Sequence, residues 1–86
     1  MMKPIQLVLL SGSDCPLCDT MKEALKHFKS PLPFQVREVD ISEHPTLQER
    51  YWDRIPYLFV AGRPVAKGCL QTSKLQLALV AAKAGL

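Results

Sequence analysis

The sequence predicts an α/β domain with the element order β-α-β-α-β-β-α, built on a four-stranded mixed sheet with helices on both faces. Three observations lead to this prediction. The 86 residues leave room for one hydrophobic core, so residues 1–86 should form a single domain. Short apolar runs alternate with segments of helical periodicity. Breaks rich in Pro, Gly, Ser and Asp separate these segments.

The first strand and the first helix lie on either side of a polar break at residues 11–14. Ile5–Leu10 is an almost continuous apolar run, which is typical of a central strand buried on both faces. A helix is predicted from Cys15 to Phe28, and the Ser-Pro-Leu-Pro segment at 30–33 ends it. Its apolar stripe consists of Leu17, Met21, Ala24, Leu25 and Phe28, while Lys22, Glu23, Lys26 and Lys29 should face water.

A second strand and a short second helix follow. Apolar residues alternate with charged ones over 34–40, which indicates a less buried strand. Pro45 suits the first turn of a helix. Leu47 and Tyr51 then have the i, i+4 spacing that gives such a helix a small apolar face.

The last three elements are a hairpin and a helix. Residues 57–60 are apolar throughout and predict a third strand. A tight turn at 61–63 leads into a strand over 64–67, where Pro64 fits only an edge position. The final helix should start with Thr72 or Ser73 as its N-cap and run to about Lys83.

The connections decide how these strands are ordered. A right-handed crossover makes the first two strands parallel neighbours, and the two most apolar strands, the first and the third, should be central. This arrangement is that of the thioredoxin fold in its minimal, glutaredoxin-sized form.

Composition excludes several classes of function. The net charge of +3 is spread along the chain without a basic block, so no nucleic-acid or membrane partner is expected, and we expect a monomer. Met1, Met2 and Lys3 before the apolar run resemble a signal peptide, but the run is too short and lacks a cleavage site. Three cysteines are an odd and small set for a secreted disulfide scaffold. These observations predict a cytoplasmic protein.

Cys15-Pro16-Leu17-Cys18 is the motif that indicates chemistry. It lies where the first strand ends and the first helix begins, which is the place of a thioredoxin-like redox motif. Free N–H groups and the helix dipole should stabilise a thiolate at Cys15, and Pro16 costs no helical hydrogen bond there. Cys15 should then attack a substrate disulfide and Cys18 should resolve the mixed disulfide.

Two features complicate this interpretation of the motif. Asp14 and Asp19 flank it and oppose a thiolate, with Lys22 as the nearest compensating cation. The alternative is half of a zinc site, for which the remaining ligands are few: Cys69, His27 and His44. Because zinc usually needs four ligands, the redox interpretation is favoured and no metal site is predicted.

Ile55-Pro56 precedes the third strand, where proline is not an ordinary central residue. In the thioredoxin fold this loop packs beside the dithiol, and the residue before a cis-proline pairs with the substrate backbone. We therefore predict a cis peptide bond at Ile55-Pro56, against the low general frequency of cis X-Pro bonds.

With these residues in place the chain resembles the small bacterial glutaredoxin-like proteins. The resemblance covers nearly the whole chain, and four segments carry it: residues 13–18, 39–41, 54–56 and the closing segment at Gly68. It implies a thiol-disulfide oxidoreductase that transfers electrons with glutathione or a dithiol, without a bound cofactor, on disulfide-containing proteins or small thiols. Candidate substrate contacts are Pro16, Leu17, Arg54, Ile55, Pro56 and Gly68.

The chain departs from glutaredoxins after the hairpin. Those proteins normally carry Gly-Gly-x-Asp-Asp, which helps to hold glutathione, whereas residues 67–71 here are Lys-Gly-Cys-Leu-Gln. Leu70 and Gln71 offer no carboxylate to the glutathione ammonium, while Arg54 and Lys67 remain as cations for its carboxylates. We therefore expect weakened glutathione use.

Other functions stay open on the sequence alone. The main rival is a thioredoxin-fold binding module without redox turnover, and a third hypothesis is a copper or iron-sulfur carrier. Cys69 is interpreted as structural or as a second redox partner. Tyr51 and Trp52 suggest partial packing, with Trp52 also placed to touch a partner.

Overall fold

The computed structural model describes residues 3–85 and shows the predicted element order. Met1, Met2 and Leu86, which the expected domain 1–86 includes, lie outside the described residues. The elements are β1 Ile5–Ser11, α1 Pro16–His27, β2 Phe34–Asp40, η1 Ile41–Glu43, α2 Pro45–Tyr51, β3 Tyr57–Val60, β4 Arg63–Lys67 and α3 Thr72–Lys83. The 3₁₀ turn η1 is an addition to the prediction.

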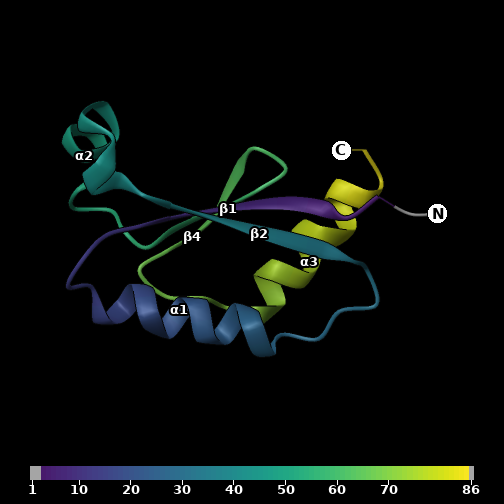
Figure 1. The fold of residues 1–86 in the computed structure, drawn as a ribbon. Helices are drawn as coiled ribbons and strands as arrows, with labels where there is room; N and C mark the ends of the chain where they lie inside the picture. Colours follow the sequence, from purple (N-terminus) through teal and green to yellow (C-terminus); the bar gives the residue numbers. More distant parts are fainter. Residues whose placement is uncertain (1–2, 86) are drawn as a thin grey trace.

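The sheet is mixed, and its strand order is β2-β1-β3-β4. β1 pairs in parallel with β2 and antiparallel with β3, and β3 pairs antiparallel with β4. The central positions of β1 and β3 and the edge position of Pro64 are therefore confirmed. Figure 1 shows α1 and α3 on one side of the sheet and α2 on the other side, beyond one end of the strands.

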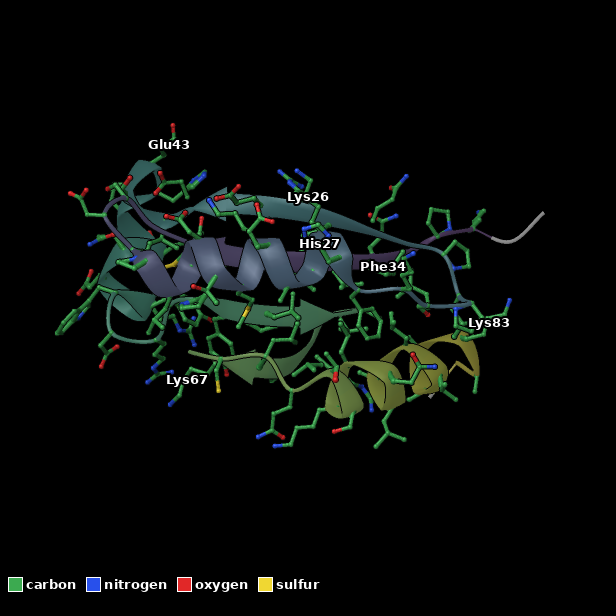
Figure 2. All side chains as sticks on the ribbon, turned by 90° about the horizontal axis from the view of Figure 1, so that it is seen from below. Lys26, His27, Phe34, Glu43, Lys67 and Lys83 are labelled. Carbon is green, nitrogen blue, oxygen red and sulfur yellow. A yellow bond between two sulfur atoms is a disulfide. The ribbon has the colours of Figure 1, made fainter. Side chains whose placement is uncertain are left out.

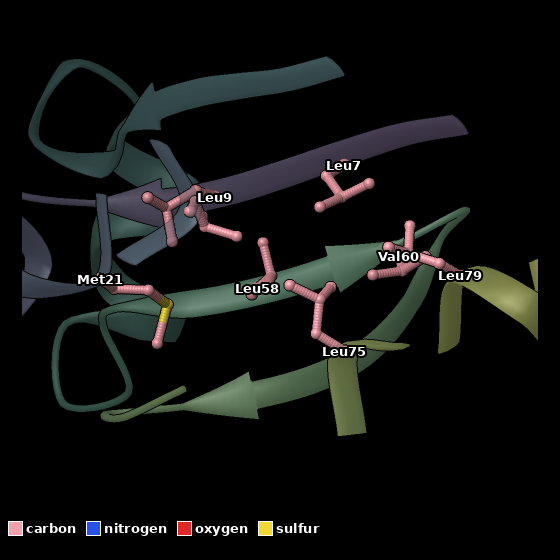
Figure 3. Close-up of a cluster of buried hydrophobic side chains, with 8 residues drawn as sticks. Leu7, Leu9, Met21, Leu58, Val60, Leu75 and Leu79 are labelled. Carbon is pink, nitrogen blue, oxygen red and sulfur yellow. The ribbon is translucent and has the colours of Figure 1, made fainter. Parts of the chain in front are cut away.

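The core lies between the sheet and the two long helices. Alternation along β1 and β3 directs Leu7, Leu9, Leu58 and Val60 to this side, where helix residues meet them (Figure 3). The buried cluster comprises Leu7, Leu9, Met21, Leu25, Leu58, Val60, Leu75 and Leu79. No described helix has the length and apolar character needed to cross a bilayer.

The hairpin turn is tighter than predicted. Ala61 and Gly62 both have positive φ, 49° and 83°, and Val60 pairs directly with Arg63. A two-residue loop with positive φ at both positions matches the twist of the strands that it joins. Arg63 is therefore the first residue of β4 and not part of the turn.

Two predictions about the helices are wrong. Leu17 was expected in the apolar stripe of α1, but it is 57% exposed, because the buried stripe runs through Cys18, Met21 and Leu25. Leu17 precedes Cys18 by one residue, which rotates it about 100° away from that stripe. The N-cap of α3 is Gln71, not Thr72 or Ser73, and it makes no side-chain capping bond.

Candidate redox site

The N-terminus of α1 positions the two cysteines differently. Cys15 is the N-cap residue, with an extended backbone, and Pro16 is the first helical residue. The backbone N–H of Cys18 donates to Cys15 Sγ at 3.1 Å. The Cys18 side chain is 0% exposed, whereas Cys15 is half-buried. One sulfur can therefore be approached from outside and the other cannot.

Cys15 and Cys18 are joined by a disulfide, with 5.2 Å between their Cα atoms. This is the pairing that the motif predicted. In the reduced state the N–H of Cys18 and the positive end of the α1 dipole both favour negative charge on Cys15 Sγ. Cys69 is an exposed free thiol in the loop before α3.

The Ile55-Pro56 bond is cis, as predicted. Pro56 is buried and its carbonyl accepts a 2.8 Å hydrogen bond from the N–H of Gly68, so the segment after the hairpin is tied to this loop. A Cβ added to Gly12 would lie 2.7 Å from Ile55 Cδ1. Since Gly12 directly follows β1, its lack of a side chain lets the Ile55-Pro56 loop pack against the loop that carries Cys15.

Two open clefts meet at Cys15 and share residues 12–16 as a common wall. The first has a volume of about 430 Å³, and its further lining residues are Leu17, Ile41, Ser42, Gln48, Trp52 and Ile55. The second has a volume of about 590 Å³ and is also lined by Asp19, Lys22, Glu38 and Asp40.

These clefts gather some of the predicted site residues and leave others aside. Cys15, Pro16, Leu17 and Ile55 line the first cleft. Arg54 and Gly68 are not among the described lining residues of either cleft, and Arg54 is half-exposed beside Asp53, at 3.9 Å.

Sequence reasoning missed a charged network beside the second cleft. The Ser11 hydroxyl and Lys22 Nζ both donate to Glu38 Oε2, at 2.7 and 3.0 Å, and Lys22 also pairs with Asp19 at 3.3 Å. Lys22 is therefore half-buried and paired with two carboxylates. Its predicted role as the cation that compensates the acidic residues of the motif is confirmed at Asp19, whereas the prediction that Lys22 simply faces water is wrong because Glu38 also binds it. The signal available in the sequence was Ser11, a polar residue that ends an otherwise apolar strand.

The network sets the ionisation of its members. The hydrogen bonds from Ser11 and then Lys22 hold the pKa of Glu38 below its usual value, and the bond to Glu38 raises the pKa of Lys22. The hydroxyl and backbone N–H of Ser42 likewise lower the pKa of Asp40. Both carboxylates beside the cleft are therefore ionised at neutral pH.

Glu38→Gln should reduce the acid sensitivity of the fold. A carboxyl whose pKa is lower in the folded protein than in the unfolded chain stabilises the fold at any pH above its pKa in the unfolded chain. This stabilisation is lost as the pH falls through its pKa in the folded protein. The pair is partly exposed, so this contribution is at most about 1 kcal/mol. Urea unfolding should show that the free energy of unfolding decreases less between pH 7 and pH 3 for Glu38→Gln than for the unaltered protein. Glu49→Gln on the exposed face of α2 is the control, and an equal effect of both variants would contradict the assignment.

The described residues do not assemble a metal site. Within residues 3–85 no three His, Cys, Asp or Glu side chains are grouped as metal ligands. His27 is in the last turn of α1 (Figure 2), about 14 to 18 Å along the helix axis from the two cysteines at its start. It is 3.2 Å from Glu23, and His44 precedes α2.

Fold and site together define a protein of the thioredoxin fold with a cysteine pair at the start of its first helix. The chain belongs to the glutaredoxin-like domain family (DUF836), whose model matches residues 6–80.

Solved structures agree with this assignment. A protein of Nitrosomonas europaea, Ne2328, has the same fold, with a TM-score of 0.72 and 23% identity over 87% of this chain and 91% of that chain. The protein XcR50 of X. campestris has a TM-score of 0.66 and 28% identity, over 87% of this chain and 96% of that chain. The thioredoxin-like protein BC3987 has a TM-score of 0.59 and 27% identity, over 84% of this chain and 97% of that chain.

Proposed function

We propose that the protein is a thiol-disulfide oxidoreductase in which Cys15 is the nucleophile and Cys18 the resolving thiol. The single observation that carries this proposal is the asymmetry of the pair. Cys15 is half-buried at a helix N-terminus, lines both clefts and accepts an N–H at Sγ, whereas Cys18 is fully buried. An approaching disulfide therefore meets Cys15 first.

The proposed reaction transfers two electrons to the substrate. The thiolate of Cys15 attacks one sulfur of a substrate disulfide, and the other sulfur leaves as a thiolate that takes up a proton. The thiolate of Cys18 then attacks Cys15 Sγ, releases the first substrate sulfur as a thiol, and leaves the Cys15–Cys18 disulfide seen here. A small thiol or a dithiol protein returns the pair to its reduced form. The reducing cytoplasm is the compartment that fits this cycle.

The remaining candidate residues would shape the contact surface. Pro16 and Leu17 flank Cys15 on the exposed side of the helix start, and Ile55 lies across the first cleft. Pro56 and Gly68 support this wall through their hydrogen bond. Arg54 stands outside the clefts, so we assign to it only a peripheral contact with a substrate carboxylate.

Glutathione should be a poor partner. The ammonium of bound glutathione would find no carboxylate at residues 70 and 71, so it would lose a charge-assisted hydrogen bond. Leu70 is partly buried against the core, and Gln71 is exposed and uncharged at the start of α3. Gln71→Asp should raise glutathione turnover by an amount worth about 1 kcal/mol or less, as for an exposed ion pair. Leu70 is less suitable for this test because an aspartate there would remove an apolar contact with the core.

The test is a disulfide-exchange assay run once with glutathione and once with a dithiol as electron donor. We expect turnover with the dithiol and slow turnover with glutathione, which Gln71→Asp increases. Ser73→Asp, two residues after Gln71 and in the first turn of α3, is the control for added negative charge. Exchange with neither donor would refute the proposed activity, and turnover with glutathione as fast as with the dithiol would refute the predicted donor preference.

A further inference from the structure

Two large apolar side chains stand exposed beside Cys15. Trp52 follows α2 and is 65% exposed, and Leu17 in the first turn of α1 is 57% exposed. They come from separate elements yet line the same cleft as Cys15. Exposed apolar groups that gather around one reactive atom are typical of a surface that contacts a partner. Trp52 in particular is not accounted for by packing within the described chain.

The charge on the wall of this first cleft is negative. Asp14 is its charged lining residue within the described chain, and it also lines the neighbouring cleft. That second cleft adds three more carboxylates, Asp19, Glu38 and Asp40, against the single cation Lys22, which already pairs with two of them. The chain as a whole carries +3, so the negative charge is local to Cys15.

A substrate that reaches Cys15 therefore meets the exposed apolar side chains of Trp52 and Leu17 in one cleft and an acidic surface in the adjoining one. Local charge acts only over about 8 Å at physiological ionic strength, so it selects groups next to the reacting disulfide and not the whole partner. Glutathione carries two carboxylates against one ammonium, so its net negative charge is disfavoured beside the acidic cleft, and it has no apolar side chain for Trp52 and Leu17.

We propose that the substrate is a protein segment whose reacting cysteine lies next to an apolar side chain on one side and a lysine or arginine on the other. Trp52 and Leu17 would receive the apolar side chain, and Asp14 with the second cleft would receive the cation. This inference rests on the proposed oxidoreductase function and specifies its substrate.

Three disulfide-bonded peptides that differ only beside the cysteine test the proposal with the dithiol as electron donor. One peptide carries Leu and Lys on the two sides of the cysteine, one carries Leu and Glu, and one carries Ala and Lys. We expect the highest kcat/KM for Leu and Lys. Replacing Lys by Glu should lower it about five- to tenfold, since attraction becomes repulsion at an exposed site. The charge effect should shrink as salt is raised.

Matched variants assign the preference to residues. Trp52→Ala should lower kcat/KM about three- to tenfold for the Leu and Lys peptide and leave the Ala and Lys peptide nearly unchanged. Leu77→Ala, which removes another exposed apolar side chain on α3, is its control. Asp14→Asn removes a negative charge from the cleft wall, so it should narrow the difference in kcat/KM between the Leu and Lys peptide and the Leu and Glu peptide. Asn tolerates the positive φ of 52° found at Asp14, so the backbone there should be retained. Glu49→Gln is the control for this variant.

The outcomes separate the two proposals. Reduction of none of the peptides would refute the oxidoreductase function itself. Reduction of all three at equal rates, or a preference for Glu over Lys, would overturn the substrate assignment and leave the activity standing. Equal losses with Trp52→Ala and Leu77→Ala would remove Trp52 from the contact surface.

Discussion

Cys18→Ser is expected to accumulate a covalent adduct with its substrate, whereas Cys15→Ser should form none. Without the buried thiol behind it, the mixed disulfide at Cys15 loses its internal route of resolution and persists. In Cys15→Ser the remaining sulfur of the pair is 0% exposed, so a substrate disulfide cannot reach it. Turnover should fall to the uncatalysed background in Cys15→Ser and should slow in Cys18→Ser, where only the external donor can resolve the adduct.

Mass spectrometry after incubation with a peptide disulfide measures the adduct directly. Cys69 is exposed and free, so it would form adventitious mixed disulfides of its own. Both variants are therefore best compared in a Cys69→Ser background, and Cys69→Ser alone should keep the turnover of the unaltered protein. Equal adduct in the two variants, or adduct only in Cys15→Ser, would contradict the assigned roles.

The fold could be predicted from the sequence because its strands are marked by both period and boundary. Residues 34–40 and 57–60 are observed with the predicted bounds, since proline segments precede both. The apolar character of residues 5–10 identified a central strand, and the observed sheet order follows from that choice and the crossover rule.

What could not be predicted depends on contacts between elements. The network of Ser11, Glu38 and Lys22 requires the parallel register of β1 and β2, in which Leu9 is opposite Glu38, and that register is not visible in periodicity. The helical period also placed Leu17 in the core, because a stripe drawn from sequence has no defined edge. Leu70 packs against the core just before α3, a tertiary contact that capping preferences at Thr72 and Ser73 do not include.

The candidate site shows the same division. The cysteine pair belongs to a local motif, and the cis-proline was predicted from the fold that the element order indicated. The role of Trp52 depends on which cleft α2 approaches, and that follows from the packing of α2 beside η1, which periodicity does not show.

Leu79→Ala should destabilise the protein far more than Leu77→Ala, although the two residues are two positions apart on the same helix. Leu79 is 0% exposed and belongs to the buried cluster, where Figure 3 shows it beside Val60, whereas Leu77 is 70% exposed. Truncating a buried leucine removes its transfer free energy and leaves a cavity, at a cost of about 2–5 kcal/mol. At roughly 0.05–0.15 kcal/mol per residue, a domain of this length has a total stability of about 4–13 kcal/mol, so the loss is a large fraction of it.

Urea unfolding followed by circular dichroism compares the two variants. Both substitutions introduce the same residue into α3, and alanine has the higher helix propensity, so the helical contribution is matched. Leu77→Ala should therefore stay within about 0.5 kcal/mol of the unaltered protein. Leu79→Ala should shift the midpoint to much lower urea. Similar midpoints for the two variants would show that α3 does not pack on the sheet through Leu79, and the core described here would be wrong.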